Sequence, residues 1–227
     1  MFPAVLTPDA NGLAFVGGDL TPSTITEAYT RGLFPWRGGK NIPWYLPHNR
    51  AVLVVGTMHV PHSLAKKARS GKLTVAFDKD ARGAQLRCAT TTREWEKGTW
   101  ITPDMVTAHD LLRARGVSHS VEVYRDGEPV GGLYGLTFGR FFHGESMYFK
   151  EPDASKLALW ALSEALAKRG FVLIDCQVPT PHLLSLGAEV WSSAHYLAEL
   201  SRNRGVSSLH ESWAPFKVDC LPPLCEI

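Results

Sequence analysis

The sequence predicts an α+β fold, in which a small N-terminal domain precedes a larger domain with helices flanking a mixed sheet. The first observation is a hairpin: residues 119–125 alternate between polar and apolar side chains, Asp126-Gly127 favours a tight turn, and residues 128–138 return. The second is the order that follows, in which a strand over 140–147 leads to a helix and then to a strand over 171–177. At 227 residues the chain has room for one large domain, or for one domain together with a small one.

Cap and turn signals place the elements of the first half. Thr21-Pro22 is typical of a helix start and Gly32 of a helix end, which predicts a helix over 22–31. The segment 34–47 is rich in Gly, Pro and Trp and is interpreted as a rigid loop. An apolar strand follows Arg50, so a boundary near Arg50 would divide the chain into domains 1–50 and 51–227. The other predicted elements are a strand over 51–55, a helix over 63–70, a strand over 73–77 and helices over 80–89 and 103–115.

A long helix dominates the second half. Asp153 is expected to cap it, and the helical pattern runs to residue 169. Leu159, Leu162 and Leu166 fall on one face, a spacing that indicates a core contact, although the same stripe would wall an apolar pocket if the neighbouring sheet splays. Short helices are predicted over 181–186 and 193–201.

A carboxylate and an amide interrupt the end of the last predicted strand. The apolar run 170–174 indicates burial, and Asp175 and Gln177 then face the same side because side chains alternate along a strand. Burying either group costs free energy unless it is hydrogen-bonded, so this pair before a Pro-rich loop suggests a site. The alternative is a pair that only anchors the loop, since most buried polar groups are simply satisfied.

Composition and charge restrict the classes of function. No apolar run reaches the length of a bilayer span, and the N-terminus lacks the basic region of a signal peptide. The four cysteines form no Cys-x-x-Cys pair, which favours a reducing cytoplasm. Residues 28–77 hold eight Lys or Arg and no Asp or Glu, whereas residues 101–227 hold 11 basic and 15 acidic residues. This asymmetry indicates a surface for a polyanion such as nucleic acid, or else a basic face that is only solvated.

Several catalytic motifs are absent from the sequence. It contains no Gly-x-x-x-x-Gly-Lys-Ser/Thr loop, Gly-x-Gly-x-x-Gly, His-Glu-x-x-His or Gly-x-Ser-x-Gly, and its nine histidines do not cluster at metal spacing. We therefore expect no metal, no cofactor and no nucleotide hydrolysis. The order of hairpin, strand, helix and strand suggests an acetyltransferase-type (GNAT-type) fold, yet the Arg/Gln-x-x-Gly-x-Gly/Ala turn for the coenzyme A pyrophosphate is missing. Residues 113–118 and 202–207 come nearest to that turn.

Ten short motifs become recognisable when they are taken together in chain order. They are Asn11-Gly-Leu, Gly17-Gly-Asp-Leu20, Gly32-Leu-Phe-Pro-Trp36, Trp44-Tyr-Leu-Pro47, Gly98-Thr-Trp-Ile-Thr-Pro103, His119-Ser-Val-Glu-Val123, Gly131-Gly-Leu-Tyr-Gly135, Gly144-Glu-Ser-Met147, Asp153-Ala-Ser-Lys156 and Ile174-Asp-Cys-Gln-Val-Pro-Thr180. Each is weak alone. The ordered set, which runs from residue 11 to about residue 200, resembles the leucyl/phenylalanyl-tRNA–protein transferase family.

The resemblance implies a bacterial cytoplasmic enzyme of the N-degron pathway. Such an enzyme moves Leu or Phe, with Met as a further candidate, from aminoacyl-tRNA to the N-terminal Arg or Lys of an acceptor protein. It would act as a monomer, with no membrane partner. The resemblance also implies a small N-terminal domain and an acetyltransferase-like C-terminal domain. It explains the missing pyrophosphate turn, because the donor is an ester on RNA and not a thioester of coenzyme A.

The same resemblance assigns roles to residues. Gln177, backed by Asp175, would orient and activate the acceptor amine as the catalytic pair, and Glu145 would hold polar groups of the substrate. Trp36 and Trp100 would lie near the terminal adenosine of the tRNA, where stacking is worth roughly 1–3 kcal/mol per base. The pocket for the donor side chain would be lined by Leu133, Phe142, Leu159, Leu162, Leu166 and Ile174. The surface for the acceptor stem would comprise Lys66, Lys67, Arg69 and Lys72.

The sequence departs from the family pattern in places, and other interpretations stay open. His109 stands where the family has Tyr, and residues 148–152 differ from the usual sequence after Met147. A coenzyme A-dependent N-acetyltransferase is one alternative, disfavoured by the missing turn. A non-catalytic RNA-binding module is another, disfavoured by the Asp175 and Gln177 pair. Trp36 would then only pack in a loop, and the basic residues would form a solvated helix face.

Overall fold

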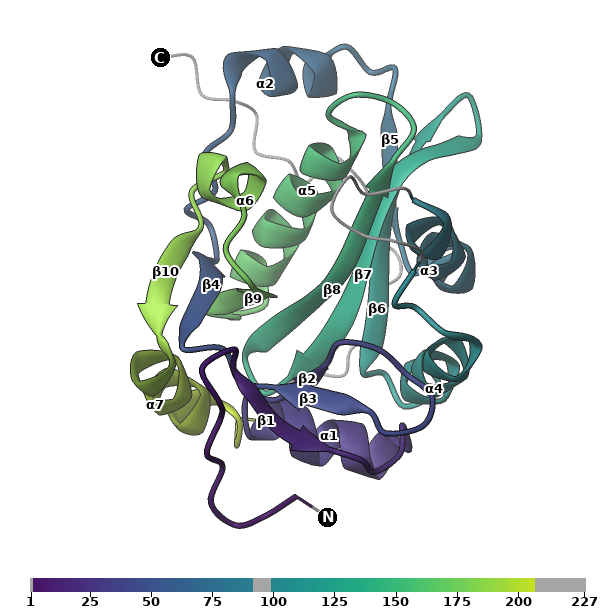
Figure 1. The fold of residues 1–227 in the computed structure, drawn as a ribbon. Helices are drawn as coiled ribbons and strands as arrows, with labels where there is room; N and C mark the ends of the chain where they lie inside the picture. The colour runs from purple at the N-terminus through teal and green to yellow at the C-terminus, as the bar shows by residue number, and fades with distance from the viewer. Residues whose placement is uncertain (1, 92–98, 207–227) are drawn as a thin grey trace.

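The computed structural model describes residues 2–91 and 99–206, which form two sheets surrounded by helices (Figure 1). The strands are β1 (Leu13–Val16), β2 (Phe34–Pro35), β3 (Pro43–Tyr45), β4 (Asn49–Val54), β5 (Thr74–Phe77), β6 (Ser118–Arg125), β7 (Glu128–Phe138), β8 (Phe141–Phe149), β9 (Leu173–Gln177) and β10 (Glu189–Ser192). The helices are α1 (Pro22–Thr30), α2 (His62–Arg69), α3 (Ala81–Thr90), α4 (Pro103–Arg113), α5 (Ala154–Lys168), α6 (Pro181–Ser185) and α7 (Ser193–Asn203). None of the helices in these described ranges is both long enough and apolar enough to cross a membrane.

The first 45 residues contribute α1 and a small antiparallel sheet of order β1-β3-β2. The predicted helix is confirmed: the Thr21 side chain accepts a hydrogen bond from the backbone N–H of Thr24 and Pro22 follows the cap. The prediction of a loop over 34–47 was wrong, because β2 and β3 lie inside it. These strands are two and three residues long, too short for an alternating pattern to be read in the sequence.

The large sheet has the strand order β10-β4-β9-β8-β7-β6-β5. Its β8 and β9 are parallel, whereas the other neighbouring strands pair antiparallel. The α+β fold with a mixed sheet and flanking helices is therefore confirmed, and so is the expected succession of hairpin, strand, helix and strand. The sequence did not predict β10, a four-residue edge strand whose side chains are mostly exposed, so no apolar alternation marks it.

Helices cover both faces of this sheet (Figure 1). Successive side chains of a strand point to opposite faces, and neighbouring residues of β7 show the result. Leu133 belongs to the main apolar core beneath α5, while Tyr134 packs with residues of α3 and α4. The buried leucine stripe of α5 thus serves as core, as its spacing indicates.

The parallel strands β8 and β9 part soon after they meet. They pair over three residues, and the last pair joins His143 to Asp175. Beyond it β8 continues to Phe149 beside β7, whereas β9 ends at Gln177 beside β4. The β7–β8 ladder also shifts register around Glu145, which makes Glu145 the extra residue of a bulge. A bulge re-aims a side chain, and the β4–β9 ladder also shifts register between Asp175 and Gln177. Glu145 and Gln177 thus both lie at irregular backbone positions just past the last β8–β9 pair.

Two predicted boundaries take a different form in the structure. Asp153 precedes α5, but it adopts a left-handed φ of 69° and makes no cap hydrogen bond, because its carboxylate binds Lys156 instead at 2.8 Å. Arg50 lies inside β4, which belongs to the large sheet, while the small sheet lies within residues 13–45. The division into domains 1–50 and 51–227 stays a prediction.

Candidate active site

Asp175 is fully buried near the end of β9 and binds side chains from three other elements. Arg50 on β4 donates twice, from Nε to Oδ1 at 2.7 Å and from Nη2 to Oδ2 at 2.6 Å. Oδ2 also accepts hydrogen bonds from His143 Nδ1 on β8 and from the Tyr196 hydroxyl on α7, each at 2.8 Å. Burial by itself would raise the pKa of Asp175, but the Arg50 charge and the bonds from His143 and Arg50 hold that pKa well below its usual range. Asp175 is therefore a fixed anion whose oxygens are already in use.

Gln177 is joined to Asp175 through its backbone. Its N–H donates to Asp175 Oδ1 at 3.0 Å, and its φ is 57°, in the left-handed region that residues other than glycine rarely adopt. The alternation of side chains along β9 therefore stops before Gln177. Backbone strain of this kind persists only where the surroundings impose it, and the anchored carboxylate of Asp175 provides that constraint. The structure thus joins the two predicted catalytic residues through the backbone N–H of Gln177 and the carboxylate of Asp175, whereas the sequence predicted two side chains that face the same side of the strand.

Glu145 is held by the N-terminal part of the chain. Tyr29 on α1 is 1% exposed, and its hydroxyl donates a hydrogen bond to Glu145 Oε1. Burial raises the pKa of Tyr29 well above its usual value and the charge of Glu145 adds to this, so the hydroxyl stays protonated and acts as a donor. Burial also raises the pKa of Glu145 to about 7, opposed by the Tyr29 bond and assisted by the charge of Asp175.

The six apolar residues expected to line a donor pocket are all buried in one core cluster. They pack against one another and against α5, with side-chain exposures between 0% and 3%. Met147 and Cys176 are partly exposed and pack at the edge of this cluster. The role of the six residues as a pocket lining stays a prediction, and Met147 and Cys176 are the partly exposed members of this edge that lie nearest in sequence to Glu145 and Gln177.

The two tryptophans lie on segments that contact each other. Trp36 is 43% exposed and its ring meets the ring of Tyr45 edge-on at 5.2 Å. The loop after Trp36 is fixed to the start of α4, because the N–H of Gly39 donates to Asp104 Oδ2 at 2.7 Å. Trp100 is partly buried four residues before Asp104 and packs against the apolar cluster beneath α3. Base stacking requires an aromatic side chain that solvent can reach, and Trp36 is exposed, whereas Trp100 is partly buried.

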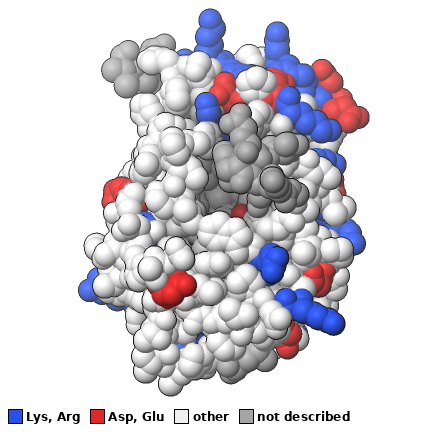
Figure 2. All heavy atoms as spheres, in the orientation of Figure 1, with Lys and Arg blue, Asp and Glu red and all other residues white. Residues whose placement is uncertain are grey.

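The basic residues on and after α2 do not share one environment. Lys66 and Arg69 line a surface pocket together with His62 and Ser63. Lys67 instead binds Glu151 at 2.9 Å and also donates to the backbone of the loop before α5. Figure 2 shows the Lys and Arg side chains of this end of the molecule projecting above α2, with acidic side chains beside them. The exposed Lys72 follows α2.

His109 is buried on α4. Its Nδ1 bonds to Ser118 Oγ at 3.0 Å, and its ring meets Tyr134 edge-on at 5.0 Å. Burial lowers the pKa of His109 to about 3, and the charge of Arg113 adds to this. His109 is therefore neutral near pH 7 and makes packing and hydrogen-bond contacts inside the protein.

Sequence reasoning missed the partners that hold the site together, namely Tyr29, Arg50, His143 and Tyr196. The missing information is long-range, since Arg50 and Asp175 are 125 positions apart. One signal was present: a buried carboxylate needs a cation, and Arg50 stands directly before a run that is otherwise apolar.

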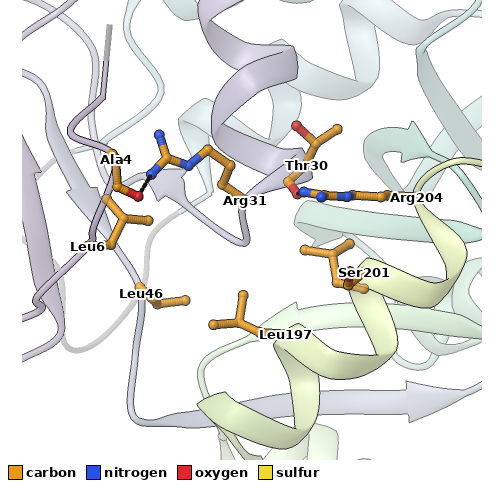
Figure 3. Close-up of a pocket in the computed structure, with 9 residues that line it drawn as sticks. Ala4, Leu6, Thr30, Arg31, Leu46, Leu197, Ser201 and Arg204 are labelled. Atoms are coloured by element: carbon orange, nitrogen blue, oxygen red, sulfur yellow. Dashed lines mark hydrogen bonds between the residues drawn. The ribbon is translucent and has the colours of Figure 1, made fainter.

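A separate pocket lies between the N-terminal segment, the end of α1 and α7 (Figure 3). Arg31 and Arg204 both project into this region, but each is engaged: Arg31 donates to the Ala4 carbonyl and Arg204 to the Thr30 carbonyl, both at 3.1 Å. The remaining lining is mostly aliphatic. None of the residues assigned to the candidate site lines this pocket.

Comparisons with known proteins agree on one family. The family model described as leucyl/phenylalanyl-tRNA protein transferase matches residues 52–201, and the model of the N-terminal domain of that family matches residues 18–48. A leucyl/phenylalanyl-tRNA–protein transferase of Pseudomonas entomophila (strain L48) is 49% identical over 196 residues, which are 86% of each chain. One from Dechloromonas aromatica (strain RCB) is 42% identical over 222 residues, 96% of this chain and 95% of that protein.

Among solved structures, a GCN5-related N-acetyltransferase from Kribbella flavida matches with a TM-score of 0.41 and 14% identity. That match covers 62% of this chain and 53% of the other. The assignment of the family rests on the sequence relatives, whose identity to this chain is high over most of its length. The family match over residues 52–201 also includes Glu145, Asp175 and Gln177. The chain belongs to the leucyl/phenylalanyl-tRNA–protein transferase family.

Proposed function

We propose that this protein moves Leu or Phe, and in principle Met, from aminoacyl-tRNA to the N-terminal Arg or Lys of acceptor proteins. Membership of the family supports transfer from aminoacyl-tRNA to protein. The choice of Arg or Lys, action as a monomer in the cytoplasm and a role in N-degron degradation are parts of the same proposal. The aminoacyl ester is itself activated, so the reaction requires no cofactor.

The observation that carries the proposal is the pair of polar residues at the point where β8 and β9 part. Glu145 and Gln177 follow the last strand pair on either side, and an anchored anion, Asp175, belongs to that pair and binds the backbone N–H of Gln177. The apolar core cluster reaches the same place through Met147 and Cys176. Polar groups for an amine beside an apolar surface for a Leu or Phe side chain are what this transfer needs.

The acceptor amine has to be uncharged when it attacks the ester carbonyl, and the pKa of an α-amino group in a free peptide is about 7.7–8.0. Gln177 is suited to positioning this amine, because its backbone is fixed by Asp175 and its neutral amide is a poor base. Asp175 contributes a negative charge near the reacting nitrogen, although Arg50 compensates much of it. A cationic acceptor also suits Glu145 and the acidic C-terminal half.

The segment before α5 argues against coenzyme A as the donor. An N-acetyltransferase of this fold class would hold the pyrophosphate at that helix N-terminus. Here the segment carries Glu151, which binds Arg125 and Lys67, and Asp153, which binds Lys156. These three cations are thus already paired with carboxylates of the segment, and the segment lacks the Arg/Gln-x-x-Gly-x-Gly/Ala turn that would bind a pyrophosphate group.

A transfer assay tests the proposal directly. The protein is incubated with radiolabelled Leu-tRNA or Phe-tRNA and a peptide that begins with Arg, and in parallel with labelled acetyl-CoA. We expect label on the peptide from the charged tRNAs alone. A peptide beginning with Ala and an N-acetylated Arg peptide are the controls. Label from acetyl-CoA only, or equal label on all peptides, would reject the proposed donor or the proposed acceptor.

Neutralising the basic face of α2 is expected to weaken tRNA binding. The double variant Lys66→Gln/Arg69→Gln should reduce the slope of log K against log salt by about two, because each lost phosphate contact removes about one from it. The matched control is Lys67→Gln, whose ammonium already binds Glu151. The Lys67→Gln variant should change the slope by clearly less than a single substitution at Lys66 or Arg69 does. Equal slopes in all three proteins would remove this face from the tRNA path.

Two tryptophan substitutions separate core from pocket. Leu166 is 0% exposed, so Leu166→Trp is expected to cost about 1–3 kcal/mol of stability and to lower the melting temperature without changing donor preference. Met147 is partly exposed at the edge of the same cluster, so Met147→Trp should instead raise the KM for Phe-tRNA more than that for Leu-tRNA. An equal change of KM for both donors in Met147→Trp would contradict a pocket at this place.

A further inference from the structure

The bulge in β8 carries the carboxylate of Glu145, to which the proposed reaction has so far assigned no chemical step. Glu145 is the residue left over where Tyr134 pairs with Ser146 and Gly135 pairs with Gly144. It follows the last β8–β9 pair closely, opposite the end of β9 where Gln177 lies. Glu145 is partly buried and one of its oxygens, Oε1, is held by Tyr29. The backbone irregularity thus places an acid beside the end of β9, where the amine is expected, with one of its oxygens bonded to Tyr29.

We infer that Glu145 is the catalytic base that accepts the proton of the acceptor amine, and that Tyr29 is a positioning residue that holds Glu145 for this purpose. The inference rests on the proposed transfer reaction and names the group that moves its proton. The other polar groups of the site are unsuitable. Asp175 has both oxygens engaged by Arg50, His143, Tyr196 and the backbone of Gln177, and the amide of Gln177 is a poor base.

The environment of Glu145 sets its proton affinity near that of the amine. Three charged or titratable groups act on it, namely Tyr29 on α1, Asp175 on β9 and Arg50 on β4. Burial raises the pKa of Glu145 to about 7, against a usual value of 4.5. A base works best when its pKa lies near the pH at which it operates and near that of the group it deprotonates. The hydroxyl of Tyr29 cannot compete for the proton, since burial raises its own pKa well above the usual value.

The proton balance of the step is closed. The neutral amine attacks the ester carbonyl carbon, and a C–N bond forms. The proton that the nitrogen then loses passes to the Glu145 carboxylate. The C–O bond of the ester breaks, and the leaving ribose oxygen takes this proton from Glu145, which restores the carboxylate. The products are the new peptide bond and tRNA with a free terminal hydroxyl, and no oxidant, metal or further reactant is required.

The test is the dependence of kcat on pH at saturating charged tRNA and Arg peptide. For the wild type, kcat should rise with pH through about 7 as Glu145 loses its proton. Glu145→Gln keeps an acceptor for Tyr29 but no base, so kcat should fall by ~10²–10⁴-fold. The rise near pH 7 should then disappear and leave only the rise at about 7.7–8.0 that comes from ionisation of the acceptor amine itself. Tyr29→Phe removes a hydrogen-bond donor that favours the ionised carboxylate, so the rise of kcat should move to higher pH. At pH values above this shifted rise, kcat should approach that of the wild type.

Glu122→Gln is the matched control. Glu122 is also a buried glutamate on a strand, and burial raises its pKa to about 7 as well. Its carboxylate, however, accepts hydrogen bonds from Ser120 on β6 and from the backbone of Lys79, which follows β5. Its profile should match the wild type. A loss in Glu145→Gln that lies wholly in the KM for the peptide would overturn the inference, since Glu145 would then only bind the acceptor. The inference would also be overturned if the rise of kcat with pH stayed at the wild-type pH in Tyr29→Phe, or if it moved to another pH in Glu122→Gln. If the wild type transfers nothing at all, the proposed function fails instead.

Discussion

Replacing Arg50 with methionine is expected to lower the free energy of unfolding by about 3–5 kcal/mol at pH 7. The guanidinium and the carboxylate of Asp175 are both 0% exposed, so the substitution leaves a buried negative charge without its counter-ion. Methionine retains much of the aliphatic volume, which limits the contribution of a cavity. Urea unfolding of both proteins, followed by circular dichroism, measures the difference.

This loss should shrink under mild acid. In the wild type the folded pKa of Asp175 is lowered, so the ionised carboxylate contributes stability above its unfolded pKa of about 4, and this is lost as the pH falls through the folded pKa. Without Arg50, burial raises the pKa of Asp175, and protonation then removes the unpaired charge. The difference between the variant and the wild type should therefore be smaller at pH 5 than at pH 7.

Asp175→Asn is the control for this pH dependence, because it keeps Arg50 but removes the group that titrates. Its destabilisation should be similar at pH 5 and pH 7. If Arg50→Met shows the same loss at both pH values, the buried charge is not the cause of that loss.

Gln177→Ala is expected to lower kcat by about 10²-fold while the Kd for charged tRNA and the melting temperature stay close to wild type. The side chain would orient the amine, and the backbone would remain tied to Asp175 through the N–H of residue 177. Gln177→Gly is the matched variant. Glycine adopts the observed φ of 57° without strain, so it should lose the same activity while its melting temperature is equal to or above that of wild type.

The double variant Asp175→Asn/Gln177→Ala should be barely slower than the slower single variant, because residues that act as one unit are not additive. Full activity of Gln177→Ala at an unchanged melting temperature would end its assignment. Catalysis would then rest on proximity and on Glu145. Activity that falls only in proportion to unfolded protein would identify the pair as a loop anchor.

Most of the larger sheet could be predicted because its signals are local. Asp126-Gly127 fixes a hairpin between two alternating strands, and Thr21-Pro22 with Gly32 fixes the ends of α1 within about one residue. Short edge strands lack such signals. β10 has exposed side chains and β2 has two residues, so both form only because a neighbouring strand is there to pair with them.

The site was predicted in part for the same reason. The motif around Asp175 identifies the carboxylate and the amide, but the left-handed backbone of Gln177 depends on a hydrogen bond to a side chain that Arg50 fixes from another strand. The bulge at Glu145 depends on the register of β7 against β8, which no single strand sequence shows. Neither Tyr29 nor Tyr196 carries a local mark of its partner.

The position of β4 in the large sheet has a consequence for how the protein folds while it is being synthesised on the ribosome. This strand is synthesised early, yet its neighbours in the sheet are β9 and β10, which come last among the strands. The 125 positions between Arg50 and Asp175 take roughly 6–25 s to translate at ordinary rates of synthesis. During that time Arg50 has no counter-ion and β4 has no partner on either side. A nascent chain can therefore form its hairpin and α5 while it is still being made, but the site is assembled only after β9 has been synthesised, and a product that ends before β9 lacks Asp175 and Gln177.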